Sequence, residues 1–410
     1  MFFRVTLPLA AANFVNQASR TVMAIVGPVL ATEFGLSASE LGLLAACMFA
    51  AYGLSQLPVG VALDTIGPRR LQMALMLVAA AGFALFALSS GLTGFAAARV
   101  MLGVGVSGGL MSIIKGNTQW FAPAKVAGMT GIAMAVSSLG SVLTTAPAEA
   151  VLPALGWRGV FWLLAGLAVA ASLWIGLAVK DKALPAKRKS LKAEMAVTGA
   201  LLGSRNFWRY APAVAMLSVL NFTYLGLWAG PWLRDVAGYD GPARAQTLLW
   251  YTLAMLSGSL VIGQVASRVQ ARGHSPFLVP MLCTAGLVAV QVGLMLYGLA
   301  LLPANPWAIG VLWIAFAFFG ASGPTGYIAV GQMFPPEHTG RVSTAANSLV
   351  LGGAFLLQTA IGWILDLWPR TAAGGWDARG YSAALMLSIA LHLLAAAHLA
   401  GWTTPWRRAP

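Results

Sequence analysis

The chain has 410 residues, of which 59% are hydrophobic and only 9% are charged, and its net charge at pH 7 is +14. A soluble domain carries about 25% charged residues, so this composition excludes a soluble globular protein and indicates that most of the surface faces lipid. The positive charge does not indicate nucleic-acid binding, because the largest basic cluster, between residues 180 and 209, has no aromatic platform or binding motif.

The sequence contains no recognisable catalytic or metal-binding motif. A nucleophile elbow, a phosphate-binding loop and a His-Glu-x-x-His pattern are all missing. The two cysteines, Cys47 and Cys283, lie inside apolar runs, and the four histidines are scattered. We therefore expect a protein that is not an enzyme and that has neither a metal site nor a cofactor.

Apolar segments of membrane-spanning length follow one another along the chain. A membrane helix needs about 20 apolar residues, and most joins between the segments are marked by glycine, proline or charge. The twelve predicted helices cover residues 5–30, 40–63, 71–91, 94–119, 126–152, 158–179, 207–233, 244–268, 276–302, 307–333, 341–368 and 380–402.

One long polar stretch divides these helices six and six. We expect an N-terminal bundle at 1–179, a basic cytoplasmic linker at 180–206 and a C-terminal bundle at 207–410. The halves repeat each other, since Phe121-Ala-Pro123 and Phe334-Pro335-Pro336 occupy matching joins about half a chain apart. Lysine and arginine gather at alternate helix ends, which predicts that both termini are cytoplasmic.

The loop between the second and third predicted helices is short and charged. It reads Gly60-x-x-x-Asp64-x-x-Gly67-Pro68-Arg69-Arg70, and Gly67-Pro68 cannot continue a helix. In this context the pattern resembles the loop between helices 2 and 3 of the major facilitator superfamily of transporters. The same residues would also fit a capped turn with positive-inside charges. In the second half, Ser267 stands where the first copy has Asp64.

Other segments are similar to the same family. Arg99-x-x-x-Gly103-x-Gly105 resembles its helix-4 motif, and Gly156–Phe161 and Gly226–Leu233 resemble further family segments. The Gly-Pro-x-x-Gly-Gly pattern that drug–proton antiporters often carry in helix 5 is missing. The resemblance implies an all-α membrane protein with twelve transmembrane helices in two pseudo-symmetric six-helix bundles, which open a central cavity alternately to each side.

The resemblance also implies a gate at the charged loop. Asp64 is expected near the start of the eleventh helix, where exposed N–H groups and Arg341 favour a negative charge. The contact would steady the outward-open state. The expected gate residues are Gly60, Asp64, Gly67, Arg69, Arg70 and Arg341.

The first predicted helix has one polar face. Asn13, Asn16, Gln17 and Arg20 follow one another at i, i+3, i+4 and i+7. Arg20 falls near mid-membrane, where lipid exposure would cost about 2.5 kcal/mol or more. The face must therefore contact protein or a wet cavity. It either binds substrate or forms a structural polar network.

The fourth predicted helix carries a second set of polar residues. Ser112 and Lys115 share a face, and Lys115 would either reach the headgroups or contribute to the site. Arg99, in the helix-4 motif with Gly103 and Gly105, would brace neighbouring helices.

Uncharged polar groups in the second half could form the other wall of a site. Each alone would also fit helix–helix packing. They are Asn221, Tyr224, Trp228, Thr325, Tyr327, Asn347 and Gln358.

Acidic residues are missing from the middle of the predicted helices. Glu149 and Asp366 lie near outer helix ends and are the candidates for carrying protons. A cavity that holds Arg20 and no central acid should attract anions.

The expected function is uptake of a small organic anion across the cytoplasmic (inner) membrane by a secondary transporter, a symporter that works by rocker-switch alternating access. Two alternatives stay open: a proton-driven exporter of a drug or metabolite, and a membrane receptor or assembly factor that does not transport. The expected partners are an anionic small molecule, membrane lipid and, as coupling ion, protons. No nucleic-acid partner is expected, and we expect a monomer.

Overall fold

The computed structural model describes residues 1–180, 196, 199–303, 305–335, 339–372 and 374–401, and these contain helices and no strand. The chain divides into two compact units, residues 1–195 (the N-unit) and 196–410 (the C-unit). Residues 181–195 and 197–198 of the expected linker lie outside the described residues.

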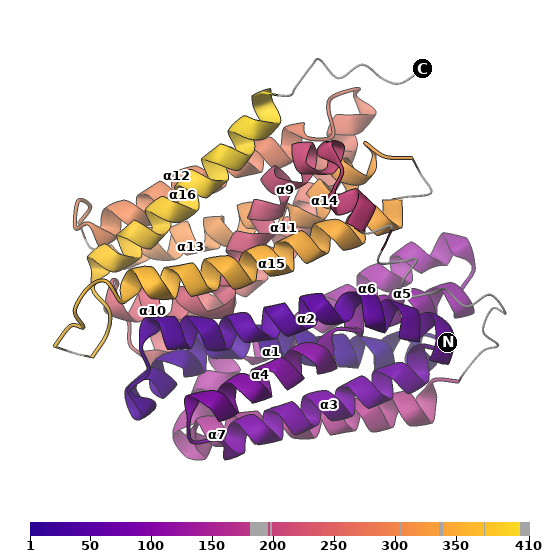
Figure 1. The fold of residues 1–410 in the computed structure, drawn as a ribbon, viewed down its shortest axis with the longest axis horizontal. Coiled ribbons are helices and arrows are strands. Elements are labelled where there is room, and N and C mark those ends of the chain that lie inside the picture. Colours follow the sequence, from indigo (N-terminus) through magenta and orange to yellow (C-terminus); the bar gives the residue numbers. More distant parts are fainter. Residues whose placement is uncertain (181–195, 197–198, 304, 336–338, 373, 402–410) are drawn as a thin grey trace. The chain divides into compact units, whose positions relative to one another are not determined.

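The N-unit is a bundle of long helices that pack along their lengths (Figure 1). Helix α1 packs against α5, α6 and α7, while α3 packs against α4 and α7. Its elements are η1 (Phe2–Arg4), α1 (Thr6–Phe34), α2 (Ala38–Ile66), α3 (Pro68–Leu88), α4 (Leu92–Val106), α5 (Gly109–Trp120), α6 (Pro123–Leu143) and α7 (Ala146–Ala178).

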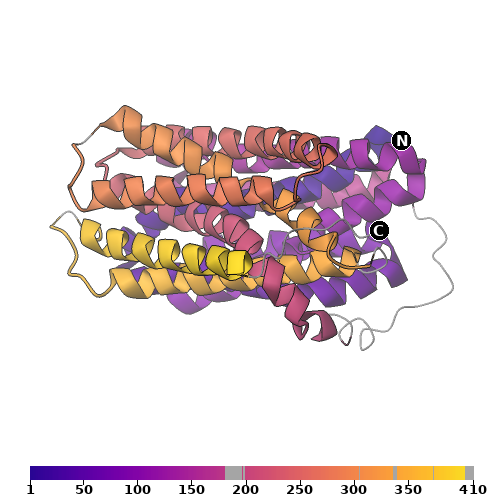
Figure 2. The same cartoon turned by 90° about the horizontal axis from the view of Figure 1, so that it is seen from above.

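The C-unit is built in the same way (Figure 2). Its first helix, α9, continues through a π-helical turn into α10 and packs against α14, α15 and α16. Its elements are α9 (Arg205–Thr223), η2 (Tyr224–Trp228), α10 (Ala229–Asp235), α11 (Gly241–Ala271), α12 (Leu278–Gly298), α13 (Pro306–Gly320), α14 (Gly323–Gly331), α15 (Thr339–Leu365) and α16 (Ala378–Gly401).

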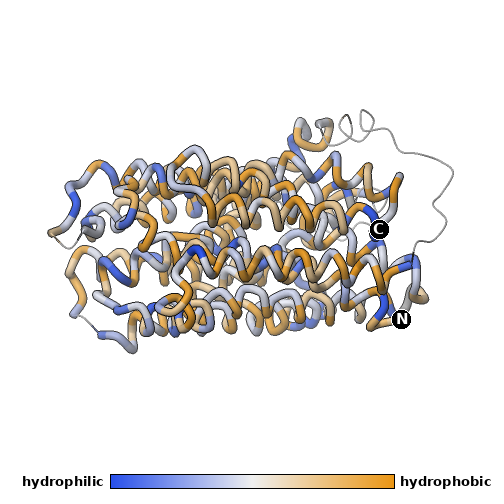
Figure 3. The backbone as a smooth tube through the Cα atoms, turned by 90° about the horizontal axis from the view of Figure 1, so that it is seen from below, coloured by the Kyte–Doolittle hydropathy of each residue, from blue (hydrophilic) through white to orange (hydrophobic). Residues whose placement is uncertain are grey.

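The described helices have the length and composition of membrane spans. Ten stretches are long and apolar enough to cross a membrane, and Gly128–Leu143 in α6 is a shorter apolar helix. Helix α1, with 29 residues, is about 43 Å long and carries the polar face. Apolar residues dominate along the helices, and hydrophilic residues are more frequent toward their ends (Figure 3). Together with α1 and α6, the ten stretches make six helical segments in each unit of the described chain. The predicted all-α fold of twelve membrane helices in two six-helix bundles is confirmed.

The prediction of one helix over 126–152 is wrong. Helix α6 ends at Leu143, and α7 begins at Ala146. Pro147 explains the break, because proline lacks an N–H and its ring clashes with the carbonyl four residues earlier. The next predicted join is present: Gly156, with φ 64° and ψ 172°, interrupts α7 in a conformation that favours glycine.

Small residues let the helices of the N-unit approach closely. A Cβ atom added to Gly103 would collide with the Met48 carbonyl of α2, and one added to Gly105 with the Ala79 backbone of α3. On α6, a Cβ at Gly140 would collide with the Phe14 carbonyl of α1. The α1–α6 contact therefore requires glycine at residue 140.

Replacing this glycine should force the two helices apart. We expect Gly140→Ala to reduce the stability of the purified protein by about 1–3 kcal/mol, the usual cost of overpacking. Thermal unfolding in detergent measures the change. Gly131→Ala is the matched control on the same helix, because a Cβ there meets nothing within 4 Å and alanine favours a helix. Equal melting temperatures for the two variants would contradict this packing.

Candidate functional site

The polar face of α1 forms a chain of hydrogen bonds that begins at Arg20, the middle residue of the helix. Arg20 Nε donates to Asn16 Oδ1 at 3.0 Å, and Asn16 Nδ2 donates to Asn13 Oδ1 at 2.9 Å. Asn13 and Asn16 are buried, whereas Gln17 and Arg20 are half-buried. The predicted face therefore runs from two buried amides to a partly accessible guanidinium.

A second helix contacts the Arg20 side chain. The guanidinium carbon lies 4.8 Å from the centre of the Tyr52 ring on α2, within the range of a cation–π contact. Sequence reasoning missed Tyr52, although it is the one tyrosine in residues 1–179. Asn16 and Tyr52 are both uncharged, and their contacts position the guanidinium from two helices.

Arg99 ties the helix that carries Arg20 to two others. It is fully buried in α4, where Nε donates to the Leu44 carbonyl of α2 at 3.1 Å and Nη1 to the Ser19 carbonyl of α1 at 3.0 Å. Arginine suits this position because its planar fork can donate in two directions at once. The contact fixes α1 one residue before Arg20.

Lys115 and Asp64 form an ion pair between α5 and α2. The Nζ and Oδ1 atoms are 2.7 Å apart, and both side chains are about one quarter exposed. One turn earlier on α5, buried Ser112 donates to Gln72 on α3 at 2.8 Å. The sequence predicted that Lys115 either reaches the lipid headgroups or contributes to the site, and it did not predict the pairing with Asp64. The predicted contact of Asp64 with the helix near Arg341 would join the two units and stays a prediction.

The rest of the charged loop has local structural roles. Gly67 makes the turn with φ 84°, and Pro68 is the first residue of α3. Arg69 donates from Nη2 to the Gly176 carbonyl at 2.7 Å, near the C-terminus of α7, where a positive charge is favourable. Gly60 is half-buried and Arg70 is exposed. The turn thus anchors α3 to α7.

The C-unit places four predicted site residues inside its own bundle, where they join neighbouring helices. Tyr251 donates to Asn221 at 2.5 Å, and Tyr224 bonds Ser388 at 3.3 Å. Trp228 donates to the Gln358 carbonyl at 3.2 Å. Tyr251 and Ser388 were missed because no periodic signal marks them.

The π-helical turn explains the position of Gln358. A wider turn leaves backbone carbonyls without their usual partners in the helix, and the Gln358 amide donates to the Phe222 carbonyl at 3.3 Å. Thr325 is buried, while Tyr327 and Asn347 are half-buried.

The two acids proposed for proton coupling have different surroundings. Glu149 is half-buried in the first turn of α7. Asp366 lies in an exposed turn, because α15 ends at Leu365, three residues before the predicted helix end at residue 368. Pro369, which cannot continue a helix, follows closely.

Comparison with known proteins identifies the family. The sequence profile of the Major Facilitator Superfamily matches residues 9–358. The chain belongs to the Major Facilitator Superfamily. It is therefore a multi-pass membrane protein of a transporter family.

Several curated relatives in this superfamily are named as transporters of organic acids. A probable sulfoacetate transporter from Cupriavidus necator is 23% identical, covering 78% of this chain and 83% of the relative. A probable L-galactonate transporter from Escherichia coli is 25% identical, covering 66% and 63%. A putative tartrate transporter from Agrobacterium vitis is 24% identical, covering 83% and 82%.

Solved structures share the fold. An inward-facing, occupied bacterial homologue of the human lysosomal transporter Spinster has a TM-score of 0.75 at 18% identity, with 98% of each chain covered. A D-xylose–proton symporter has a TM-score of 0.70 at 14% identity, covering 94% of this chain and 96% of that one.

Arg99 offers a test of how α1 is held. We expect Arg99→Lys to lower stability by about 1.5–3 kcal/mol, because a lysine cannot maintain charge-assisted bonds to two carbonyls on different helices. Thermal unfolding checks this, with Arg70→Lys as the control, since substitutions at exposed positions usually change stability by less than about 0.5 kcal/mol. An Arg99→Lys protein as stable as the control would show that the two carbonyl bonds do not hold α1.

Proposed function

We propose that the protein is a secondary transporter that takes up a small organic anion and that Arg20 binds the negative group of the substrate. The observation that carries the proposal is the half-buried guanidinium at the middle of α1, held by Asn16 and Tyr52. A cation at this depth needs a structural or functional reason to be there. A half-buried guanidinium that is held in place is suited to bind the negative group of a substrate.

The geometry around Arg20 suits recognition of an oxyanion. Asn16 accepts from Nε, and the Tyr52 ring lies against the guanidinium. A planar guanidinium held in a fixed orientation donates two parallel hydrogen bonds to a carboxylate, sulfonate or phosphate. Gln17, half-buried on the same face, would add neutral hydrogen bonds, as would the Asn13–Asn16 pair.

The relatives support the same substrate class. Sulfoacetate, L-galactonate and tartrate, named for three of them, are all organic acids. We therefore propose a substrate with a carboxylate and at least one further polar group. The distribution of lysine and arginine supports both termini on the cytoplasmic side of the inner membrane. We propose a monomer that works by rocking of its two units, with Glu149 the better placed of the two candidate proton carriers.

Uptake into liposomes tests the transport function. Purified protein reconstituted into liposomes should give saturable uptake of labelled sulfoacetate, galactonate or tartrate, and protein-free liposomes should not. A receptor or assembly factor would bind one of these acids in detergent without moving it into the vesicles. Binding without uptake would therefore contradict the proposal, and so would uptake of organic cations alone.

Arg20→Lys tests the role of the guanidinium. We expect this variant to insert and fold but to bind the transported acid about 2 kcal/mol more weakly, because an ammonium group loses the paired charge-assisted hydrogen bond. Titration calorimetry measures the affinity. Arg4→Lys, at an exposed arginine in η1, should bind like the parent. Equal affinities of all three proteins would remove Arg20 from the site.

A further inference from the structure

Glu33, the one acidic residue of α1, contacts the part of α7 that directly follows the Gly156 kink. The Trp157 indole Nε1 donates to Glu33 Oε2 at 2.7 Å, and Arg158 Nη1 donates to Glu33 Oε1 at 3.1 Å. Trp157 is buried among Phe34, Phe86 and Phe95, and the Arg158 guanidinium lies 4.2 Å from the centre of the Trp157 ring. The contact ties the end of the first helix of the N-unit to the start of its last membrane segment.

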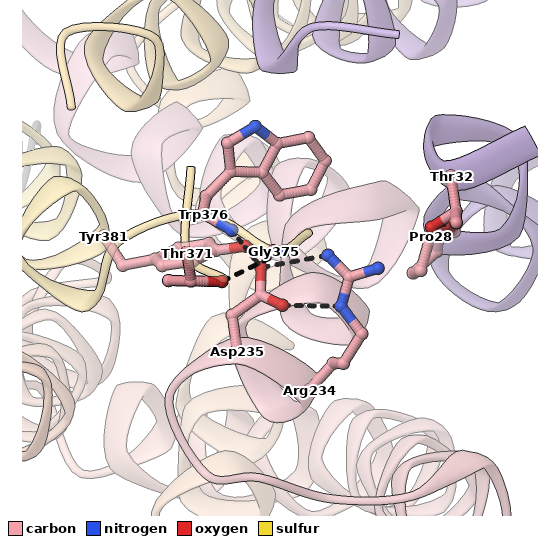
Figure 4. Close-up of polar contacts among 8 residues, drawn as sticks. All are labelled: Pro28, Thr32, Arg234, Asp235, Thr371, Gly375, Trp376 and Tyr381. Carbon is pink, nitrogen blue, oxygen red and sulfur yellow. Dashed lines mark hydrogen bonds and ion pairs between the residues drawn. The ribbon is translucent and has the colours of Figure 1, made fainter. Parts of the chain in front are cut away.

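Asp235, the last residue of α10, makes the corresponding contact in the C-unit (Figure 4). Its Oδ2 accepts from the backbone N–H of Trp376 at 3.0 Å and from the Tyr381 hydroxyl at 2.7 Å. Arg234 donates from Nε to Oδ1 at 2.5 Å, and its guanidinium lies 5.5 Å from the Trp376 ring centre. This contact ties the end of the first C-unit span to the approach to α16.

The two contacts fall at equivalent places in the duplicated sequence. Each has an acid at the end of the first span of a unit, a Gly-Trp pair before the last segment and an arginine against the tryptophan. Gly156-Trp157-Arg158-Gly159 corresponds to Gly375-Trp376-Asp377-Ala378-Arg379-Gly380, which has two additional residues. In the longer copy Arg379 does not take the place of Arg158, because its Nη2 donates to Asp377 Oδ2 at 3.0 Å and this bond lowers the pKa of Asp377. The basic partner of the buried Asp235 is Arg234.

We propose that Glu33 and Asp235 are the acids of two equivalent latches, which join the first span of each unit to its last span at the extracellular end of the bundle. The extracellular placement and the role in transport rest on the proposed function. Glu33 lies 13 residues after Arg20, about 20 Å along α1, so it is a positioning residue and does not contact the substrate. With Arg99 holding α1 at Ser19, the latch makes α1 and Arg20 move with the whole N-unit.

The two latches differ in which atom of tryptophan they use, and this difference provides a matched test. Glu33 binds the indole N–H of Trp157, whereas Asp235 binds the backbone N–H of Trp376, whose indole nitrogen has no hydrogen-bond partner among the described residues. The same change, tryptophan to phenylalanine, should therefore break the first latch and leave the second intact. Tyr381→Phe removes a hydroxyl bond and should weaken the second.

Hydrogen–deuterium exchange of the purified protein without substrate measures each latch directly. In Trp157→Phe we expect amide exchange over residues 28–37 to rise about tenfold, the factor for losing one charge-assisted hydrogen bond. In the Trp376→Phe variant, amide exchange over residues 231–239 should stay within about twofold of the parent. In the Tyr381→Phe variant, exchange over the same residues should rise about tenfold. Unchanged exchange in Trp157→Phe, or equal increases after both tryptophan changes, would overturn the latches.

Replacing the acids separates the two latches again. The Glu33 side chain is 41% exposed, and glutamine keeps an oxygen that accepts from Trp157 but removes the charge of that bond, so exchange in Glu33→Gln should rise less than in Trp157→Phe. The Asp235 side chain is 3% exposed and accepts hydrogen bonds on both of its oxygens. In Asp235→Asn the amide NH2 group would face one of these donors, so amide exchange over residues 231–239 should rise. Equal responses of the two variants would contradict the assignment.

Uptake measurements then test the positioning role. Trp157→Phe should keep KM within about twofold of the parent, because Asn16, Tyr52 and Arg99 still hold Arg20, while the maximal rate falls several-fold. A raised KM with an unchanged maximal rate would place Trp157 in the binding site and overturn the positioning role. A parent protein that takes up no acid would contradict the proposed function, and the exchange results would still decide whether the latches exist.

Discussion

Arg20 places a permanent positive charge at the midpoint of a membrane helix, and much of the N-unit is arranged around that charge. A cation at this depth costs about 2.5 kcal/mol or more if it faces lipid. The protein compensates two arginines at nearly the same level in different ways. Arg99 is fully buried and donates to two backbone carbonyls, whereas Arg20 stays half-buried against an amide and a tyrosine ring. The first cation joins helices, and the second is suited to meet an anion.

Helix α1 is held at three levels along its length. Near its start, Thr6 donates to Asn117 of α5 at 2.7 Å. At its middle, the Ser19 carbonyl accepts from Arg99, and at its end Glu33 accepts from Trp157. Between these levels the bare backbone of Gly140 lets α6 lie directly on α1. These contacts come from four different helices, so α1 and its polar face behave as part of the N-unit.

The features that the sequence predicted are those that depend on local chemistry. Apolar runs define the spans, Gly67-Pro68 and Gly156 define joins that the structure contains, and the spacing of Asn13, Asn16 and Arg20 predicts a shared face. The break at Thr144–Thr145 was missed because no charged residue marks it, and only Pro147 indicates the interruption. The exposed position of Asp366 was missed because apolar residues extend past the end of α15.

Partners across helices could not be predicted from periodicity. Helical spacing shows that Asn221, Tyr224 and Trp228 lie on one face, but it does not show which neighbouring helix each residue contacts. In the structure they bond to α11, α16 and α15, respectively. Nothing in the local sequence connects Tyr52 with Arg20, or Gln72 with Ser112, because each pair is formed by two different helices. The pairing of Lys115 with Asp64 likewise depends on how α5 packs beside α2.

The central claim is that Arg20 recognises the negative charge of the transported molecule, and a binding cycle tests it most directly. The parent and an Arg20→Gln variant would each be titrated with an acid that the parent binds and with the uncharged amide of that acid, for example galactonate and galactonamide. We predict that the parent prefers the acid by about 2 kcal/mol and that the variant binds the two molecules about equally, because the preference depends on the guanidinium. A variant that keeps the full preference of the parent for the acid would contradict the account.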